Sequence, residues 1–271
     1  MAVQIFDLSG KVSVVSGAAQ GMGRAMSVAL AESGSDMAII DLNESGLSDT
    51  ASHIRSIGRN VDTFTADVSD VESIPGIFLD VMEKYGRVDF LGNVAGGKTV
   101  MGSSEDFKVE DFEKSLKSLV IGRFLMCREA GRIMLKQGKG SIVNIGSIGG
   151  MSSLGRGQIA YQTAMGAVVQ MTRSLATEWA SRGVRVNAIL PAQVLNPGLQ
   201  ERIEKTPDVL NTFLSGIPAG RIGSPDDIKG LSVLLASDSA SWITGALIPM
   251  DGGNTALNAG GSYPGSPQTS G

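Results

Sequence analysis

Residues 16–26 read SGAAQGMGRAM and directly follow the apolar run KVSVV at residues 11–15. Gly17, Gly21 and Gly23 stand where a buried strand would turn sharply into a helix. Glycines at such a turn let the backbone approach a diphosphate, which the free N–H groups and dipole of a helix N-terminus attract. Their spacing differs from the usual dinucleotide fingerprint, but their place between a strand and a helix fits it. The stretch therefore predicts a nucleotide-binding turn.

Six further apolar runs alternate with amphipathic segments along the chain. They lie at residues 36–42, 60–68, 88–96, 140–147, 184–192 and 247–253. This alternation is typical of parallel strands joined by crossover helices, and runs that are apolar at nearly every position indicate strands covered on both faces. We therefore predict an α/β fold with one doubly wound parallel sheet of about seven strands and helices on both faces.

Three segments are expected along the chain. Residues 1–253 are expected to form one dinucleotide-binding catalytic domain. Within it, residues 193–222 are an insertion with two or three short helices between the sixth and seventh strands. The insertion lies beyond the carboxyl end of a strand, where ligands bind in such sheets, so we expect it to act as a lid. Residues 254–271 are rich in Gly, Ser and Pro, which predicts an extended or disordered tail.

Composition excludes several classes of partner. The net charge is -4 and no basic patch appears, so nucleic acid is not expected as a partner. The N-terminus does not resemble a secretion signal, and no apolar run reaches the roughly 18 residues of a membrane span. We expect a cytoplasmic protein without a membrane partner. The single cysteine, Cys127, and the single histidine, His53, leave no disulfide framework and no metal site expected.

An acidic residue is needed at the end of the second strand to bind the ribose hydroxyls of a dinucleotide. Asp41, in the run AIIDL, has this position. A carboxylate there would repel a 2′-phosphate, which predicts NAD rather than NADP as the cofactor. The alternative is that Asp41 only caps the helix that follows it.

These features, taken with five others, resemble the short-chain dehydrogenase/reductase family over residues 8–253. The other motifs are ADV at Asp67, NVAG at Asn93, IGS at Ser147 with Tyr161, RVNAILPA at Asn187 and MDGG at Asp251. The resemblance implies a single-domain Rossmann-type fold that transfers hydride between a nicotinamide and a small-molecule alcohol or carbonyl substrate. It also implies a homotetramer, a dimer of dimers.

The resemblance places cofactor contacts at several strand ends. It implies that Asp67 and Val68 hold the adenine and that Val194 holds the carboxamide. From the residues alone, both valines also fit a core, and Asn93 fits a strand-end hydrogen bond. The full set of implied contacts is Gly17, Gln20, Gly21, Met22, Gly23, Asp41, Leu42, Asp67, Val68, Asn93, Ala95, Gly96, Tyr161, Pro191, Ala192 and Val194.

Ser147 and Tyr161 match the catalytic serine and tyrosine of the family. By resemblance, Ser147 orients the substrate oxygen and Tyr161 exchanges a proton with it. They lie 14 residues apart, one more than in many members, and the glycine-rich segment between them can absorb the extra residue. Ser152 or Ser153 are alternatives for the serine hydroxyl.

Two positions depart from the family pattern. The family has a lysine four residues after the tyrosine, which binds ribose and stabilises the phenolate, but this chain has Met165. Leu119 stands where the family has an asparagine that supports a water chain to that lysine. A free tyrosine has a pKa of about 10, and an apolar neighbour does not stabilise its charged form. The chain is therefore expected to be an atypical member with an incomplete set of catalytic residues.

Three explanations remain open. In the first, which we favour, the chain is an NAD(H)-dependent oxidoreductase acting on a secondary alcohol or ketone, in which another cation or the oxidised nicotinamide does the electrostatic work of the lysine. Lys98 is the first candidate for this catalytic role and Arg156 the second. In the second, the scaffold uses bound NAD for a lyase or epimerase reaction. In the third, it binds NAD with little or no catalysis.

The substrate and the assembly are indicated only weakly. Aromatic residues make up 5% of the chain, and the predicted lid carries polar side chains, which favours a small polar substrate. The helical segments 110–135 and 158–180 carry more apolar surface than one sheet face needs, in keeping with the implied tetramer.

Overall fold

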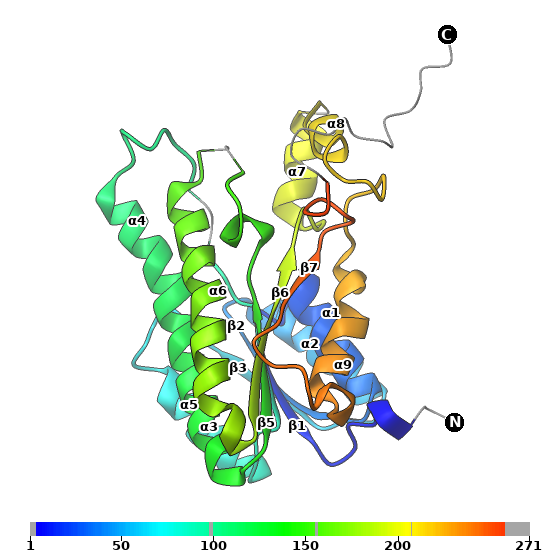
Figure 1. The fold of residues 1–271 in the computed structure, drawn as a ribbon. Helices are drawn as coiled ribbons and strands as arrows, with labels where there is room; N and C mark the ends of the chain where they lie inside the picture. The colour runs from blue at the N-terminus through cyan, green and yellow to red at the C-terminus, as the bar shows by residue number, and fades with distance from the viewer. Residues whose placement is uncertain (1–3, 98–99, 155–156, 207, 258–271) are drawn as a thin grey trace.

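The fold was determined as a computed structural model that describes residues 4–97, 100–154, 157–206 and 208–257. Its centre is a sheet of seven parallel strands in the order β3-β2-β1-β4-β5-β6-β7 (Figure 1). The strands are β1 Val12–Ser16, β2 Asp36–Asp41, β3 Val61–Thr65, β4 Phe90–Asn93, β5 Gly140–Ile145, β6 Val184–Pro191 and β7 Leu247–Met250. The seven apolar runs thus form the seven strands, and the predicted fold class is confirmed.

Helices cover both faces of this sheet (Figure 1). One layer contains α1 Gly21–Glu32, α2 Glu44–Ser56 and α9 Lys229–Ala236; the other contains α3 Ile74–Tyr85, α4 Val109–Leu116, α5 Gly122–Gln137 and α6 Ile159–Trp179. Two helices, α7 Pro197–Lys205 and α8 Asp208–Leu214, lie beyond the carboxyl end of β6. The short helical turns are η1 Gln4–Phe6, η2 Lys117–Ile121, η3 Ile148–Gly150, η4 Ala180–Arg182, η5 Pro225–Ile228 and η6 Asp238–Ala240. None of the helices in the described ranges is long and apolar enough to cross a membrane.

The core has one half on each face of the sheet. Neighbouring residues on a strand point to opposite faces, so Val15 packs with the α1 side and Val14 with the α5 side. This explains why the central strands are apolar at consecutive positions. The edge strands differ: β3 alternates between buried and more exposed residues, and the residues of β7 are partly or fully exposed. Both faces of these strands are nevertheless covered, since Val61 and Phe64 of β3 pack into opposite halves of the core.

A continuous helical stretch runs through α4, η2 and α5. The η2 turn is a π-helix, in which the backbone winds wider than an α-helix and one residue is accommodated out of phase. Gly122 follows directly, and a Cβ there would lie 2.1 Å from the carbonyl oxygen of Val68. Glycine is therefore required where this helix passes the end of β3.

The insertion at 193–222 contains α7 and α8, which agrees with the predicted short helices. Residues 254–257, at the start of the predicted tail, form a turn. The Asn254 amide donates to the carbonyl oxygen of Gly216 at 2.5 Å, and the Thr255 hydroxyl donates to Asp251 at 2.6 Å. The chain after β7 is thus tied back to the insertion. Residues 258–271 lie outside the described part of the chain.

Candidate active site

The turn between β1 and α1 has a backbone that admits no side chains at two positions. Gly17 has a φ of +73°, and a Cβ there would lie 2.8 Å from the Ala95 backbone nitrogen. A Cβ at Gly23 would lie 1.9 Å from the carbonyl oxygen of Gly17. Gln20, the N-cap of α1, makes no side-chain cap bond, so its side chain does not occupy the N–H groups that begin the helix. The turn therefore fits a diphosphate, as the sequence predicts.

Asp41 ends β2 beside this glycine turn. One carboxylate oxygen accepts from the Ala19 backbone N–H and the other from that of Asn43, both at 3.0 Å. The N-cap of α2 is Asn43, whose side chain accepts from the Gly46 N–H at 3.1 Å. The alternative that Asp41 caps this helix is therefore wrong. The two backbone bonds instead hold the Asp41 carboxylate at the carboxyl end of the sheet, beside the glycine turn, and its contact with a ribose stays a prediction.

The remaining implied cofactor residues occupy varied environments. Asp67 is exposed and accepts from the Ser69 N–H at 2.7 Å, whereas Val68 is buried. Leu42 is 64% exposed, next to Asp41. Gly96 is exposed, Ala95 and Ala192 are half-buried, and Pro191 and Val194 are buried. All follow or end a strand, so the parallel sheet brings them to one edge. Their cofactor contacts remain predictions.

Asn93 is fully buried and holds neighbouring elements together. Its side-chain amide donates to the Arg123 carbonyl oxygen at 3.0 Å and to the Asn144 side chain at 3.2 Å. The Ser16 hydroxyl donates to the Asn93 oxygen at 3.4 Å. These bonds link β1, β4, β5 and α5, which favours the strand-end interpretation for this side chain. A cofactor contact would have to come from its neighbours, or after these bonds rearrange.

Ser147 follows β5, and Tyr161 lies in α6, which packs against the η3 turn directly after Ser147. Ser147 is buried, and its hydroxyl oxygen accepts from the Gly149 N–H at 3.1 Å, which leaves the hydroxyl proton able to donate elsewhere. A Cβ at Gly149 would lie 3.4 Å from that oxygen and 3.5 Å from Gln162, the residue after Tyr161. Tyr161 itself is half-buried in the first turn of α6. The alternatives Ser152 and Ser153 are exposed.

The two residues that depart from the family pattern are packed together. Leu119 and Met165 are 3% and 1% exposed and belong to one buried cluster with Ala164 and Val168. Tyr161 packs against this cluster. The positions that the resemblance gives to an asparagine and a lysine are thus filled by a dry apolar contact. Lys98 and Arg156, the predicted replacement cations, lie outside the described residues.

Arg123 is a buried charged residue near this corner that was not predicted from the sequence. Arg123 lies on α5, one helical turn after Leu119, and is 3% exposed. The only signal in the sequence is a single arginine within the otherwise uncharged stretch LVIGRFLMC. Cys127, one turn further along, is buried, and burial raises the pKa of its thiol to about 11. A reactive thiolate is therefore not expected here.

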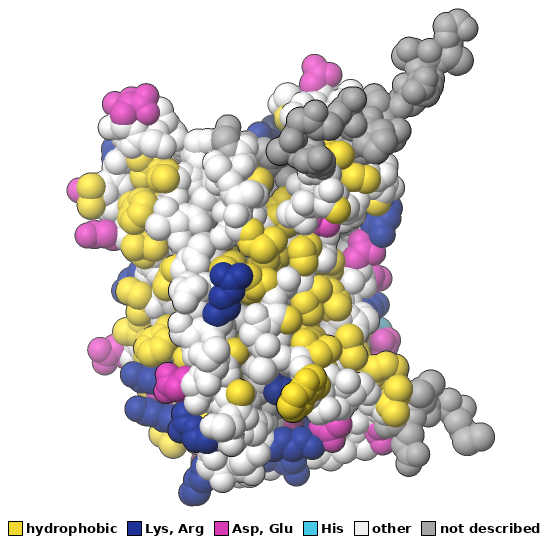
Figure 2. Space-filling view, viewed as in Figure 1, with side chains coloured by type: hydrophobic (Ala, Val, Ile, Leu, Met, Phe, Trp, Pro, Cys, Tyr) yellow, Lys and Arg dark blue, Asp and Glu magenta, His cyan; other side chains and the backbone are white. Residues whose placement is uncertain are grey.

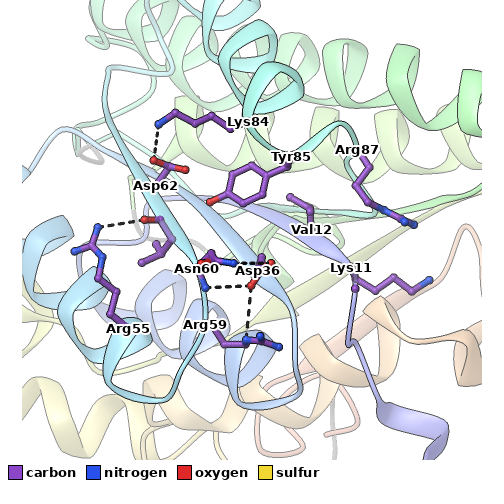
Figure 3. Close-up of a pocket in the computed structure, with 12 residues that line it drawn as sticks. Lys11, Val12, Asp36, Arg55, Arg59, Asn60, Asp62, Lys84, Tyr85 and Arg87 are labelled. Carbon is purple, nitrogen blue, oxygen red and sulfur yellow. Dashed lines mark hydrogen bonds and ion pairs between the residues drawn. The ribbon is translucent and has the colours of Figure 1, made fainter.

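Two cavities lie at opposite ends of the sheet. The larger, about 600 Å³, opens at the amino ends of β1, β2 and β3 and is lined mainly by charged side chains (Figure 3). Arg59 pairs with Asp36, and Lys84 with Asp62, so these charges satisfy one another. The smaller, about 390 Å³, lies at the carboxyl end of β6 and β7 and includes Ala192 and Val194. Because ligands bind at the carboxyl ends of strands in such sheets, the smaller cavity adjoins the candidate site and the larger does not.

Comparison with known proteins gives a consistent assignment. The family profile described as enoyl-(acyl carrier protein) reductase matches residues 17–255. A D-threitol dehydrogenase of Mycolicibacterium smegmatis is 37% identical over 252 residues, which cover 92% of this chain and 95% of that protein.

Two solved structures bear different cofactors. An NAD⁺-bound xylitol dehydrogenase matches with a TM-score of 0.85 and 29% identity, over 90% of this chain and 98% of its own. A structure from Beutenbergia cavernae, described as an NAD(P)-dependent gluconate 5-dehydrogenase with NADP at low occupancy, matches with a TM-score of 0.87 and 32% identity, over 93% of this chain and 100% of its own. The choice between NAD and NADP therefore rests on the residues of this chain.

Proposed function

This chain belongs to the short-chain dehydrogenase/reductase family, and on that premise we propose that it is an NAD(H)-dependent oxidoreductase acting on a secondary alcohol or its ketone. Its relatives are dehydrogenases and reductases, which supports the reaction type. A threitol and a xylitol dehydrogenase among them support a small polyol or related polar molecule as the substrate.

The observation that carries the proposal is that three separate parts converge on one edge of the sheet. The glycine turn follows β1, Asp41 ends β2, Ser147 follows β5, and Tyr161 lies in the first turn of α6. The turn supplies backbone N–H groups for a diphosphate and Asp41 supplies an acceptor for ribose hydroxyls. The nicotinamide, when bound, supplies or accepts the hydride.

The residues of the chain supply proton transfer and orientation. In the reductive direction the Tyr161 hydroxyl donates its proton to the substrate oxygen, and a neutral phenol can do this directly. The Ser147 hydroxyl, whose oxygen is already fixed by Gly149, donates a hydrogen bond to the same substrate oxygen. In the oxidative direction Tyr161 must accept a proton, which requires its charged form. The apolar cluster at Met165 does not stabilise that form, so oxidation makes the greater demand on the site.

Asp41 supports NAD over NADP. Its two oxygens are held by backbone bonds, so the carboxylate cannot turn away from an incoming 2′-phosphate without losing them. Two like charges brought together in this way disfavour NADP.

A fluorescence titration with NADH and NADPH tests this part of the proposal. We expect saturable NADH binding in the micromolar range and NADPH binding weaker by roughly tenfold or more, since each factor of ten corresponds to about 1.4 kcal/mol. Asp41→Asn should reduce the ratio of NADH to NADPH affinity, because it removes the negative charge and keeps the size of the side chain. Asp67→Asn, also at a strand end, serves as the matched control. If neither NADH nor NADPH shows saturable binding, the oxidoreductase proposal is wrong.

The insertion and the apolar surface extend the proposal. Helices α7 and α8 lie beyond the carboxyl end of β6 (Figure 1), the strand end at which the smaller cavity also lies, and we assign them the role of a lid. Hydrophobic side chains gather over α4 in Figure 2. Ile121 and Phe124, at the junction of η2 and α5, are 48% and 42% exposed. These residues support a tetramer assembled through α4–α5 and α6, which sedimentation analysis would test.

A further inference from the structure

Arg123, on α5, is a buried arginine that bonds to the ends of two strands at once. One terminal nitrogen, Nη1, donates to the carbonyl oxygen of Ile145, the last residue of β5. The other, Nη2, donates to the carbonyl oxygens of Ala95 at 2.9 Å and of Val94 at 3.4 Å, directly after β4. The backbone carbonyl of Arg123 accepts from the Asn93 side chain at 3.0 Å. Arg123 thus joins α5 to the carboxyl ends of β4 and β5.

These bonds begin where the backbone ladder between the two strands stops. The last paired residues of β4 and β5 are Asn93 and Asn144. Val94 and Ile145 are the next residues of the chain on each side, and the guanidinium bonds to both. At this level β5 is still paired with β6, through Ile145 and Ile189. The guanidinium therefore continues the connection between β4 and β5 past the end of their ladder.

The stretch after β4 is held from a second side by β1. The Ser16 hydroxyl oxygen accepts from the backbone N–H groups of Val94 at 3.1 Å and of Ala95 at 3.2 Å. Ser16 directly precedes the glycine turn, and a Cβ at Gly17 would lie 2.8 Å from the Ala95 nitrogen. Val94 and Ala95 are therefore held between two side chains: Ser16 binds their N–H groups and Arg123 binds their carbonyl oxygens.

This arrangement connects the two halves of the candidate site. The glycine turn belongs to the predicted diphosphate site, and Ala95 and Gly96 are predicted cofactor contacts. Ile145 lies two residues before Ser147, the predicted catalytic serine. The Arg123 guanidinium bonds both to the stretch that bears the cofactor contacts and to the strand that leads to the serine. It can therefore set the position of one half relative to the other.

The chemistry of arginine suits this task. A guanidinium is a planar fork with five N–H donors, so two of its nitrogens can bond to different strands while the group stays rigid. Burial lowers the pKa of Arg123 to about 10, and it remains charged at neutral pH. None of the ion pairs between described residues involves Arg123. A role in stability alone would not require such a costly charge, because a well-packed apolar side chain is often at least as stabilising.

We propose that Arg123 is a positioning residue that holds residues 94–96 at a fixed place relative to Ser147. It acts through the backbone carbonyls that it binds and not on the substrate itself. The inference rests on the proposed oxidoreductase function, because that function makes Ala95 and Gly96 cofactor contacts.

Hydrogen exchange of the cofactor-free protein tests whether Arg123 holds this stretch. Arg123→Met removes all three side-chain bonds and keeps a long side chain beside the apolar Leu119. We expect the backbone amides of residues 90–97 to exchange faster by about tenfold or more, because local opening of this stretch becomes easier. Amides of β2 and β3 should change only as far as the overall stability changes. Mass spectrometry of peptic peptides separates the two regions.

Binding of NADH is the second measurement. Fluorescence titration should show an NADH affinity about tenfold lower in Arg123→Met, because the predicted contacts at residues 95–96 lose their fixed position. Arg123→Lys keeps the charge but has a single nitrogen on a flexible chain, so its exchange and its affinity should lie between those of the other two proteins. If Arg123→Met does not fold, Arg123→Lys carries the same two expectations at smaller size.

Arg185→Met provides a matched control. Arg185 also donates to backbone carbonyls, those of Leu235 at 2.7 Å and Ser237 at 3.2 Å, but it lies near the amino end of β6. Burial lowers its pKa as well. The control therefore loses a similar set of bonds away from the candidate site. It should lower stability without a specific increase in exchange at residues 90–97 and without a loss of NADH affinity.

Two outcomes overturn the inference. Unchanged exchange at residues 90–97 in the folded Arg123 variants would show that the guanidinium does not hold this stretch. Faster exchange with unchanged NADH affinity would show that the bonds serve the fold alone. Failure of the proposed function is distinct from both, because it appears as absent NADH binding by the unaltered protein, before any substitution is made.

Discussion

The two ends of strands β1–β5 hold charge in opposite ways. At the amino ends of these strands, basic and acidic side chains bind one another, as in the pairs of Lys84 with Asp62 (Figure 3) and of Arg87 with Asp89. At the carboxyl ends, within the described residues, Asp41 and Arg123 are fixed by backbone groups and by no opposite charge. The larger cavity lies at the first end and the candidate site at the second. Along these strands, charge without an opposite partner, more than cavity size, marks the candidate site.

The largest effect is expected from removal of the Tyr161 hydroxyl, at the carboxyl end of the sheet. Tyr161→Phe should lower turnover by roughly 10²- to 10⁴-fold, the usual contribution of a positioned acid or base. NADH affinity and thermal stability should change little, because the side chain is half-buried and its ring is kept. Steady-state kinetics with parallel NADH titration provide the check. Equal turnover in both proteins would mean that this corner has no catalytic role.

The next largest effect is expected at the glycine turn between β1 and α1. Gly23→Ala places a Cβ against the carbonyl oxygen of Gly17, a backbone atom that cannot move aside without opening the turn. We expect NADH affinity to fall by about 100-fold, or about 2.7 kcal/mol. Gly76→Ala is the control, since a Cβ there meets nothing within 4 Å. Undiminished binding in Gly23→Ala would place the diphosphate elsewhere.

The amino end should respond in stability and not in binding. Asp89 is 8% exposed; it accepts from the Val12 N–H at 2.9 Å and pairs with Arg87 at 2.7 Å. Asp89→Ala should lower the free energy of unfolding by about 1–3 kcal/mol, because it leaves a buried donor unsatisfied. Asp62→Ala breaks a more exposed pair and should cost less than about 1 kcal/mol. Denaturant unfolding measures both, and NADH affinity should stay constant in each.

The smallest expected effect comes from restoring the family's lysine. On the sequence alone, Met165→Lys would be expected to raise alcohol oxidation and lower its pH optimum. The gain should stay below about tenfold, or 1.4 kcal/mol, because the apolar cluster around Met165 disfavours a charged lysine. Oxidation rates across pH, measured for the unaltered protein and for Met165→Lys, are the check. No gain at all would show that the site does not lack a cation at this position.

Much of the fold could be predicted because its signal is local. Each of the seven strands is marked by a short apolar run, and the turn at Gly17 by glycines that its backbone requires. The partial exposure of strands β3 and β7 could not be predicted, since it depends on their position at the edges of the sheet. That is a property of the whole sheet.

The site was predicted only in part, for a related reason. Ser147 and Tyr161 stand near each other in sequence and fall at one corner, and Asn43 takes the capping role considered for Asp41. Arg123 was missed because a charged residue in a helix normally faces solvent. Arg123 donates to the backbone carbonyls of Ala95 and Ile145. Because every residue has a carbonyl, no pattern of side chains in the sequence predicts these bonds.

The bonds from Arg123 to the ends of β4 and β5 have a consequence for how a proton leaves the site. A guanidinium does not lose its proton in proteins, so it can hold a charge but cannot pass a proton onward. Anchoring to backbone carbonyls also keeps it from swinging toward solvent. Electrostatic support and proton conduction, which one lysine can combine, cannot both come from this guanidinium. Alcohol oxidation by this protein should accordingly quicken as small buffer bases are added at constant pH and ionic strength.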